Sequence, residues 1–119
     1  MRQAWLSAEA MGPGEEQEGR GEMIGKYVIV RCRDAGVHAG VLREREGREC
    51  LLTEARRLWY WKPAKNGAFL SGVALYGLAK ESKVGEEVTI LLTENCEIIQ
   101  CTGEAEASIR AARVNVNGK

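Results

Sequence analysis

Short apolar runs rich in β-branched residues recur along the chain after Lys26, separated by turn signals. Such runs, bounded by Gly, Asp or Asn, are typical of β-strands. Asp34-Ala35-Gly36, Glu46-Gly47 and Glu94-Asn95 read as turns, and residues 62–67 as a loop. The pattern predicts six strands, at residues 27–33, 37–43, 49–53, 56–61, 87–92 and 97–100.

Two other segments follow a helical period. Residues 71–80 are expected to form a short helix that begins at an N-cap, Ser71. Its inner side would carry Leu70, Val73, Ala74, Gly77 and Leu78. A second helix is expected over 103–113 after the N-cap Thr102, with Glu near its start and Arg near its end. The sum is an α+β fold, a small and largely antiparallel β-sheet or barrel of about six strands with two short helices.

The first 22 residues differ from the rest. Residues 12–22 contain almost no apolar side chain and several Gly and Glu, a composition typical of a mobile tail. The purine-rich codons of this stretch would resemble a ribosome-binding site, so Met23 is an alternative start. We therefore expect an N-terminal extension over 1–22 and a single ligand-binding domain over 23–119, since 119 residues suffice for one compact domain.

Charge and cysteine content disfavour several classes of partner and site. The 17 basic and 17 acidic residues balance, which disfavours long nucleic acid as the main partner. No apolar run reaches the roughly 20 residues needed to span a bilayer, so no membrane partner is expected. The N-terminus does not read as a signal peptide, and a cytoplasmic protein is expected to keep its four cysteines as reduced, buried, apolar thiols. A zinc site built from them and the single histidine is not expected.

Residues 56–61 form the most unusual segment, Arg-Arg-Leu-Trp-Tyr-Trp. On a strand, alternation places Arg57, Trp59 and Trp61 on one face and residues 56, 58 and 60 on the other. Indoles stack on nucleobases, and arginine holds phosphate through paired hydrogen bonds. The same face also suits a protein interface, and either Trp is equally well suited to filling a core. Which face meets a ligand stays open.

Weaker candidates lie elsewhere. His38 stands between small residues in a hairpin-like region, where a ligand or a neighbouring subunit can approach, although an ordinary strand position explains it too. Arg110 and Arg113, at i and i+3, would suit an anion clamp or simply the carboxyl end of their helix. We find no GxSxG, HExxH or phosphate-loop motif, so we expect neither an enzyme nor a cofactor.

Four sequence segments together resemble a family of small phage proteins: residues 25–31, 35–40, 55–61 and 97–102. They look like the first type of the Thoeris anti-defence sponge proteins, over about residues 23–113. The resemblance implies a protein that sequesters cyclic ADP-ribose-type signals made by bacterial TIR-domain proteins, without cleaving them, in the cytoplasm of an infected cell. Some members of that family also take up the cyclic oligonucleotides of CBASS immunity.

The resemblance further implies a homo-oligomer, a dimer or a hexamer assembled from dimers, with pockets at subunit interfaces. Carried over to this chain, the ligand-binding candidates are Arg56, Arg57, Trp59 and Trp61, followed by His38, Arg110 and Arg113. Two rival functions stay open. One is a phage protein-interaction or assembly module with no small-molecule ligand, and the other is a small-barrel single-stranded nucleic-acid binder, which the neutral net charge disfavours.

Overall fold

The computed structural model describes residues 23–65 and 68–115. In that part of the chain a six-stranded sheet has the order β4-β3-β2-β1-β6, with β5 also pairing with β3, and every strand pair is antiparallel. The strands are β1 (Tyr27–Cys32), β2 (Gly36–Glu46), β3 (Glu49–Tyr60), β4 (Lys83–Val84), β5 (Val88–Leu92) and β6 (Asn95–Gln100). The helices are α3 (Leu70–Tyr76) and α4 (Gly103–Ala111). The predicted α+β fold, six antiparallel strands and two short helices, is confirmed.

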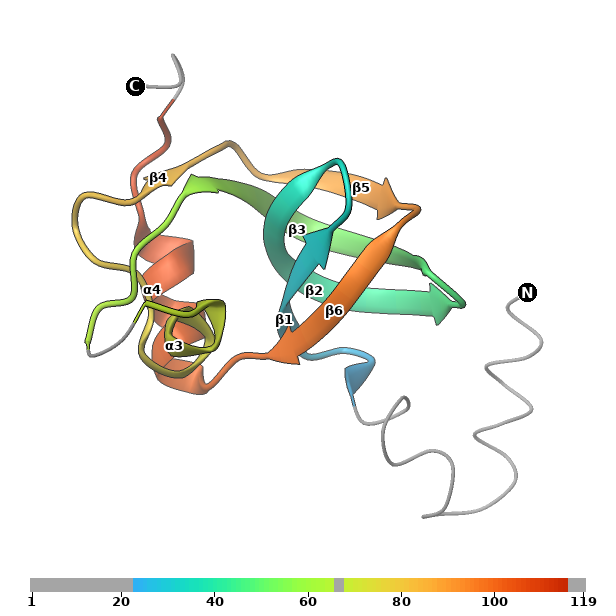
Figure 1. The fold of residues 1–119 in the computed structure, drawn as a ribbon, viewed down its shortest axis with the longest axis horizontal. Coiled ribbons are helices and arrows are strands. Elements are labelled where there is room, and N and C mark those ends of the chain that lie inside the picture. Colours follow the sequence, from blue (N-terminus) through green and yellow to red (C-terminus); the bar gives the residue numbers. More distant parts are fainter. Residues whose placement is uncertain (1–22, 66–67, 116–119) are drawn as a thin grey trace.

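β2 and β3 span 11 and 12 residues, and the sheet is strongly curved (Figure 1). Both helices lie together at one end of it, and the β2–β3 and β5–β6 hairpins lie at the other (Figure 1). Two apolar clusters fill the molecule. The first packs between the sheet and the helices, and its largest members are Tyr27, Ile29, Leu58, Leu70 and Ile109. The second lies on the other face of β1 to β3, with Val28, Val30, Leu42, Leu52 and Leu92.

Strand β1 explains why both faces are filled. Tyr27 and Ile29 belong to the first cluster, whereas Val28 and Val30 belong to the second. Successive side chains of a strand point to opposite faces, so a continuous apolar run fits a strand that is covered on both sides. The run Tyr-Val-Ile-Val is therefore the centre of the fold, and β2 and β6 flank it.

Several predicted boundaries are wrong. The third and fourth predicted strands, 49–53 and 56–61, are one strand, β3, because the chain continues through Glu54 and Ala55 in the ladder. The first helix ends at Tyr76 rather than Lys80, since Gly77 leaves the helix with φ 92°. Its N-cap is Phe69, which makes no side-chain cap, and not Ser71. The two-residue strand β4 was not expected.

Other expectations are confirmed or fall outside the described residues. Thr102 caps α4, because its hydroxyl accepts a hydrogen bond from the Ala105 N–H at 3.1 Å. Asn95 begins β6 rather than completing a turn. The extension 1–22 lies outside the described residues, as does the Asn-Gly pair of the predicted loop at 66–67.

The cysteines follow the expectation only in part. Cys32 and Cys50 are buried in the second cluster, and burial raises the pKa of Cys50 to about 11. Burial also raises the pKa of the half-buried Cys101 to about 12. Both thiols therefore stay protonated near neutral pH. Cys96 is exposed, so the prediction of a buried thiol is wrong for it.

We predict that Gly40→Ala destabilises the fold. A Cβ at this position would lie 2.9 Å from both the Ala55 Cα and the Thr53 carbonyl oxygen, and backbone atoms of a paired strand cannot move aside cheaply. Overpacking of this kind costs about 1 to 3 kcal/mol. Thermal denaturation should show a clear drop in the melting temperature. The control is Gly103→Ala, where nothing lies within 4 Å of the added Cβ. Equal melting temperatures for the two variants would contradict this packing.

Candidate functional site

The two faces of the second half of β3 have different environments. Arg56 and Leu58 are buried, at 4% and 2% exposure, and point toward the helices. Arg57 and Trp59 are exposed on the other face, Trp59 at 40%. Trp61 is half-buried and packs against the first apolar cluster. Alternation therefore separates Arg56 and Leu58, which build the interior, from Arg57 and Trp59, which meet solvent. It ends there, because Tyr60 is 46% exposed and Trp61 packs inward.

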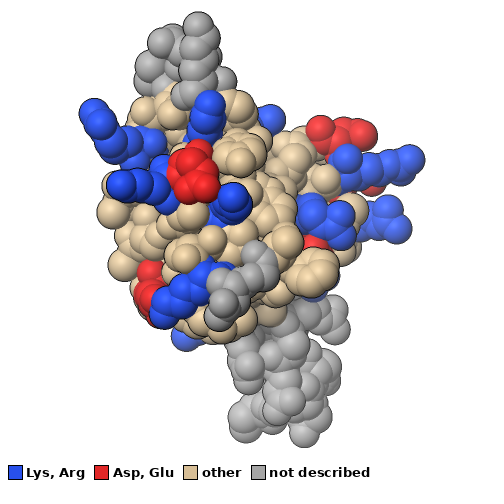
Figure 2. Space-filling model, turned by 60° about the vertical axis from the view of Figure 1, so that its left-hand side comes forward, with Lys and Arg blue, Asp and Glu red and all other residues tan. Residues whose placement is uncertain are grey.

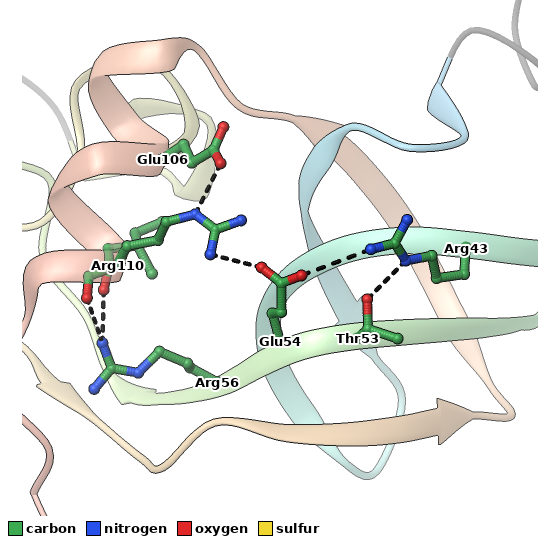
Figure 3. A network of polar contacts seen from close by, with 7 residues as sticks. Arg43, Thr53, Glu54, Arg56, Glu106 and Arg110 are labelled. Atoms are coloured by element: carbon green, nitrogen blue, oxygen red, sulfur yellow. Dashed lines mark hydrogen bonds and ion pairs between the residues drawn. The ribbon is translucent and has the colours of Figure 1, made fainter.

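Arg56 is a structural cation. Its Nε donates a hydrogen bond to the Gly85 carbonyl at 2.9 Å, and its Nη1 donates to the carbonyls of Ile109 and Arg110 at 2.8 and 3.3 Å. These last two carbonyls lie at the C-terminal end of α4, where the helix dipole concentrates negative charge (Figure 3). Nη2 is buried and meets no partner among the described residues. Arg56 thus ties β3 to α4 and lies beneath the surface.

The exposed face holds a second, different arginine. The Arg57 carbonyl accepts a hydrogen bond from the Gly85 N–H at 2.8 Å, which fixes the backbone, while its side chain points outward. Within residues 23–65 and 68–115 no carboxylate lies within 4 Å of the Arg57 guanidinium. A charged, rigidly mounted donor that meets no carboxylate among the described residues is available to an anion.

An indole and an ammonium complete this face. β4 pairs with the end of β3, Leu58 opposite Val84 and Tyr60 opposite Lys83. The Lys83 Nζ consequently lies over the Trp59 ring, 5.2 Å from its centroid, in a cation–π contact. We refer to Arg57, Trp59 and Lys83 as the β3–β4 face. Lys83 was missed by sequence reasoning because a two-residue strand has no periodicity to detect.

His38 lies next to this face but underneath it. It is 2% exposed, its Nε2 donates to the Ala35 carbonyl at 2.9 Å, and its cross-strand partner is Arg57. Burial lowers the pKa of His38 below its ordinary 6.5, and the positive charge of Arg57 lowers it further. His38 is therefore a neutral side chain of the interior in the structure, and it is not placed to touch a surface ligand.

The two arginines at the end of α4 are not placed alike. Arg110 pairs with Glu54 at 2.7 Å and with Glu106 at 2.8 Å, and its guanidinium lies 4.8 Å from the Tyr27 ring centroid (Figure 3). Its hydrogen-bonding capacity is largely used within the protein. Arg113 is exposed, beyond the last residue of α4. The structure thus brings Arg57 and Trp59 together with Lys83, and it places Arg56, His38 and Arg110 in the protein's own framework.

The surface around the helices is electrically mixed. Lys and Arg side chains gather in several groups on this side, with acidic side chains between them (Figure 2). A hollow elsewhere, lined by Arg45, Cys50 and Leu91 among others, has room for about one water molecule. Among the described residues, no cluster of His, Cys, Asp and Glu is suited to a metal ion. No helix in the described part combines the length and apolarity required to cross a bilayer.

Comparison with known proteins places the chain in a family. Residues 25–109 match a domain of unknown function (DUF6948), and the chain belongs to that family. No curated protein matches it. Among solved structures it is similar to a heptameric archaeal Sm protein, with 20% identity and a TM-score of 0.45 over 69% of this chain and 94% of that one. It is also similar to the P. aerophilum SmAP1 heptamer, with 19% identity and a TM-score of 0.49 over 77% of this chain and 100% of that one.

The burial of His38 predicts a pH-dependent stability. Because the folded pKa lies below the unfolded value of about 6.5, the unfolded chain binds the proton more tightly. The stability that neutral His38 provides is full above pH 6.5 and declines as pH falls below it. Urea unfolding between pH 7.5 and 5.5 should show this decline in the wild type, and the decline should be smaller in His38→Gln. An equal decline in both proteins would assign it to other groups.

Proposed function

We propose that this chain binds a small nucleotide without cleaving it, through the β3–β4 face. The observation that carries the proposal is the exposed Arg57, free of any carboxylate partner among the described residues, beside the partly exposed indole of Trp59. A base would stack on Trp59, and a phosphate would accept hydrogen bonds from Arg57 and Lys83. The neutral net charge fits a ligand with few phosphates, whose recognition needs only a local group of cations.

The resemblance of residues 25–31, 35–40, 55–61 and 97–102 to the anti-defence sponges makes the proposal more specific. The ligand would be a cyclic nucleotide immune signal, a cyclic ADP-ribose isomer or a cyclic oligonucleotide, and sequestering it would block Thoeris or CBASS immunity. A sponge competes with a sensor by mass action, so it needs an affinity near nanomolar, about 12 kcal/mol. No catalytic step is required of the chain.

Calorimetry tests the binding proposal. Wild-type protein should release or absorb heat with a cyclic ADP-ribose isomer or a cyclic trinucleotide, and heating the complex should return the ligand intact. Arg57→Ala and Trp59→Ala should each weaken binding about tenfold or more, since a charge-assisted hydrogen bond and a base stack are each worth about 1 to 3 kcal/mol. The matched control is Arg33→Ala, another exposed arginine, which lies on the β1–β2 turn.

Two outcomes would contradict the proposal. One is the absence of any heat from all of these ligands with folded wild-type protein. The other is a loss of affinity in Arg33→Ala as large as that in Arg57→Ala, because binding would then follow total charge and not this face. Recovery of a cleaved ligand would show that the chain acts as a hydrolase and does not only bind the ligand.

We also propose that the chain forms a homo-oligomer, and the sheet edges support this. β5 pairs with β3, and β6 pairs with β1, so each has a second edge that meets no other strand of the described chain. Val88 and Leu91 of β5 are 50% and 56% exposed. Unpaired, apolar edges of this kind are ready to add a strand from another chain. The two similar Sm structures are described as heptamers, and a dimer or hexamer is implied by the resemblance to the sponges.

The mass of the protein in solution tests this assembly. We expect a mass of several chains by light scattering for the wild type. Leu91→Lys should lower that mass, because a charge on β5 opposes strand addition at its edge. Leu75→Lys is the control, since Leu75 is 48% exposed on α3, which lies apart from β5 (Figure 1). A wild-type monomer at high concentration, or an unchanged mass in Leu91→Lys, would sink the proposed edge contact.

The alternative function, an interaction or assembly module without a small ligand, is favoured by the same exposed β5 residues. The two functions make opposite predictions for the β3–β4 face. In an assembly module, Arg57→Ala and Trp59→Ala change the oligomer mass or a protein pull-down, and no nucleotide gives heat with any variant.

A further inference from the structure

Glu54 has an exceptional backbone conformation in the middle of β3. Its φ is +55°, and it is the one residue other than glycine with positive φ in the part of the chain that the structure describes. This left-handed region is disfavoured for residues with a Cβ, and the cost is retained only where the surroundings enforce it. The left-handed conformation is therefore confined to this residue, because extended residues precede and follow Glu54 in the strand.

The unusual conformation produces a β-bulge. Thr53 pairs with Val41 and Arg56 pairs with Ala39, so Glu54 and Ala55 together stand opposite Gly40 alone. A bulge of this kind adds one residue to a strand and re-aims the side chains after it. Gly40 has no side chain where the bulge approaches, and any Cβ there would lie 2.9 Å from the Ala55 Cα.

The extra residue exchanges the faces of β3. Before the bulge, Cys50 and Leu52 point into the second apolar cluster. After it, Ala55 points into that cluster, while Leu58 points into the first one, against the helices. A shift of one residue moves every later side chain to the other face. In an unbulged strand, Arg57 and Trp59 would therefore face the helices and the even-numbered residues would face outward.

Side chains from two other elements hold Glu54 in place. Arg110 of α4 donates from Nη1 to Glu54 Oε1 at 2.7 Å, and Arg43 of β2 lies 3.6 Å from Oε2 (Figure 3). Arg43 also donates from Nε to the Thr53 hydroxyl at 2.8 Å. The side chain at the bulge is thus clamped from both sides, by a helix and by the neighbouring strand.

We propose that Glu54 is a positioning residue that turns Arg57 and Trp59 outward for ligand binding. The role in ligand binding rests on the proposed function. The face of β3 on which the side chain of residue 57 lies is measurable without any ligand. Glu54 itself touches no ligand and acts through the backbone of β3. Its carboxylate, held by two arginines, keeps a conformation that a strand-forming residue would abandon.

The test compares three substitutions. Glu54→Gly adopts positive φ without strain and should keep the bulge, with binding close to that of the wild type. Glu54→Thr carries a β-branched side chain that favours a regular strand and avoids positive φ, so nucleotide binding should weaken about tenfold or more. Glu49→Thr is the matched control, the same change at an exposed position of β3 before the bulge, and it should bind like the wild type.

A thiol probe reports directly whether the side chain of residue 57 lies on the exposed or the buried face of β3. In a chain with Arg57→Cys, iodoacetamide should alkylate the new thiol rapidly, as mapped by peptide mass. Adding Glu54→Thr should slow this alkylation strongly, and adding Glu54→Gly or Glu49→Thr should not. This measurement stands even if the wild type binds none of the nucleotides tested, so failure of the proposed function and failure of this inference are distinguishable.

The inference is overturned if Glu54→Thr leaves both the nucleotide affinity and the alkylation rate unchanged. If Glu54→Thr fails to fold, melting temperatures of Glu54→Gly and Glu54→Ala decide. A higher melting temperature for Glu54→Gly than for Glu54→Ala supports the enforced left-handed conformation. A melting temperature of Glu54→Ala equal to or above that of Glu54→Gly overturns it, because alanine stabilises a chain more than glycine wherever φ is negative.

Discussion

A buried guanidinium connects the parts of this fold. Arg56 comes from the central part of β3, and its three hydrogen bonds end on carbonyls of Gly85, Ile109 and Arg110. Burying a charge is costly unless hydrogen bonds and opposite partial charge compensate it. Here the C-terminal carbonyls of α4 supply both. One side chain therefore fixes the distance between the sheet, the end of α4 and the chain that follows β4.

The faces of β3 follow from this constraint. Once Arg56 is turned toward α4, its neighbour Arg57 must point the other way, and the indole of Trp59 shares its side. The contact is reciprocal, because Arg110 of α4 reaches back to Glu54 of β3 (Figure 3). Sheet and helix thus each contribute an arginine to the other. The exposed arginine is therefore mounted on β3, a strand that pairs with β2, β4 and β5.

Sequence patterns predicted most strands and α4, since alternation and the Thr102 cap are local signals. They divided β3 in two because Thr53-Glu54-Ala55 lacks alternation, and the bulge that carries the strand through depends on Gly40 of another strand. They also separated Arg56 and Leu58 from Arg57 and Trp59 correctly, without deciding which pair is interior. They grouped Trp61 with Arg57 and Trp59, although Trp61 packs inward and Tyr60 is exposed. That decision depends on carbonyls some 30 and 50 residues away in the chain, and arginine is seldom buried.

Exposure of the β3–β4 face limits what a single chain achieves in the proposed function. Ligand sites of high affinity are usually recessed, because a flat surface leaves much of the ligand in water. β5 pairs with β3 up to Ala55, opposite Val88, two residues before Arg57. A strand added at the free edge of β5 would lie two strand spacings, about 10 Å, from β3, and side chains of the second copy that extend past Val88 would reach toward Arg57. In the proposed oligomer those side chains would add a wall to the site, which makes assembly and affinity parts of one physical requirement.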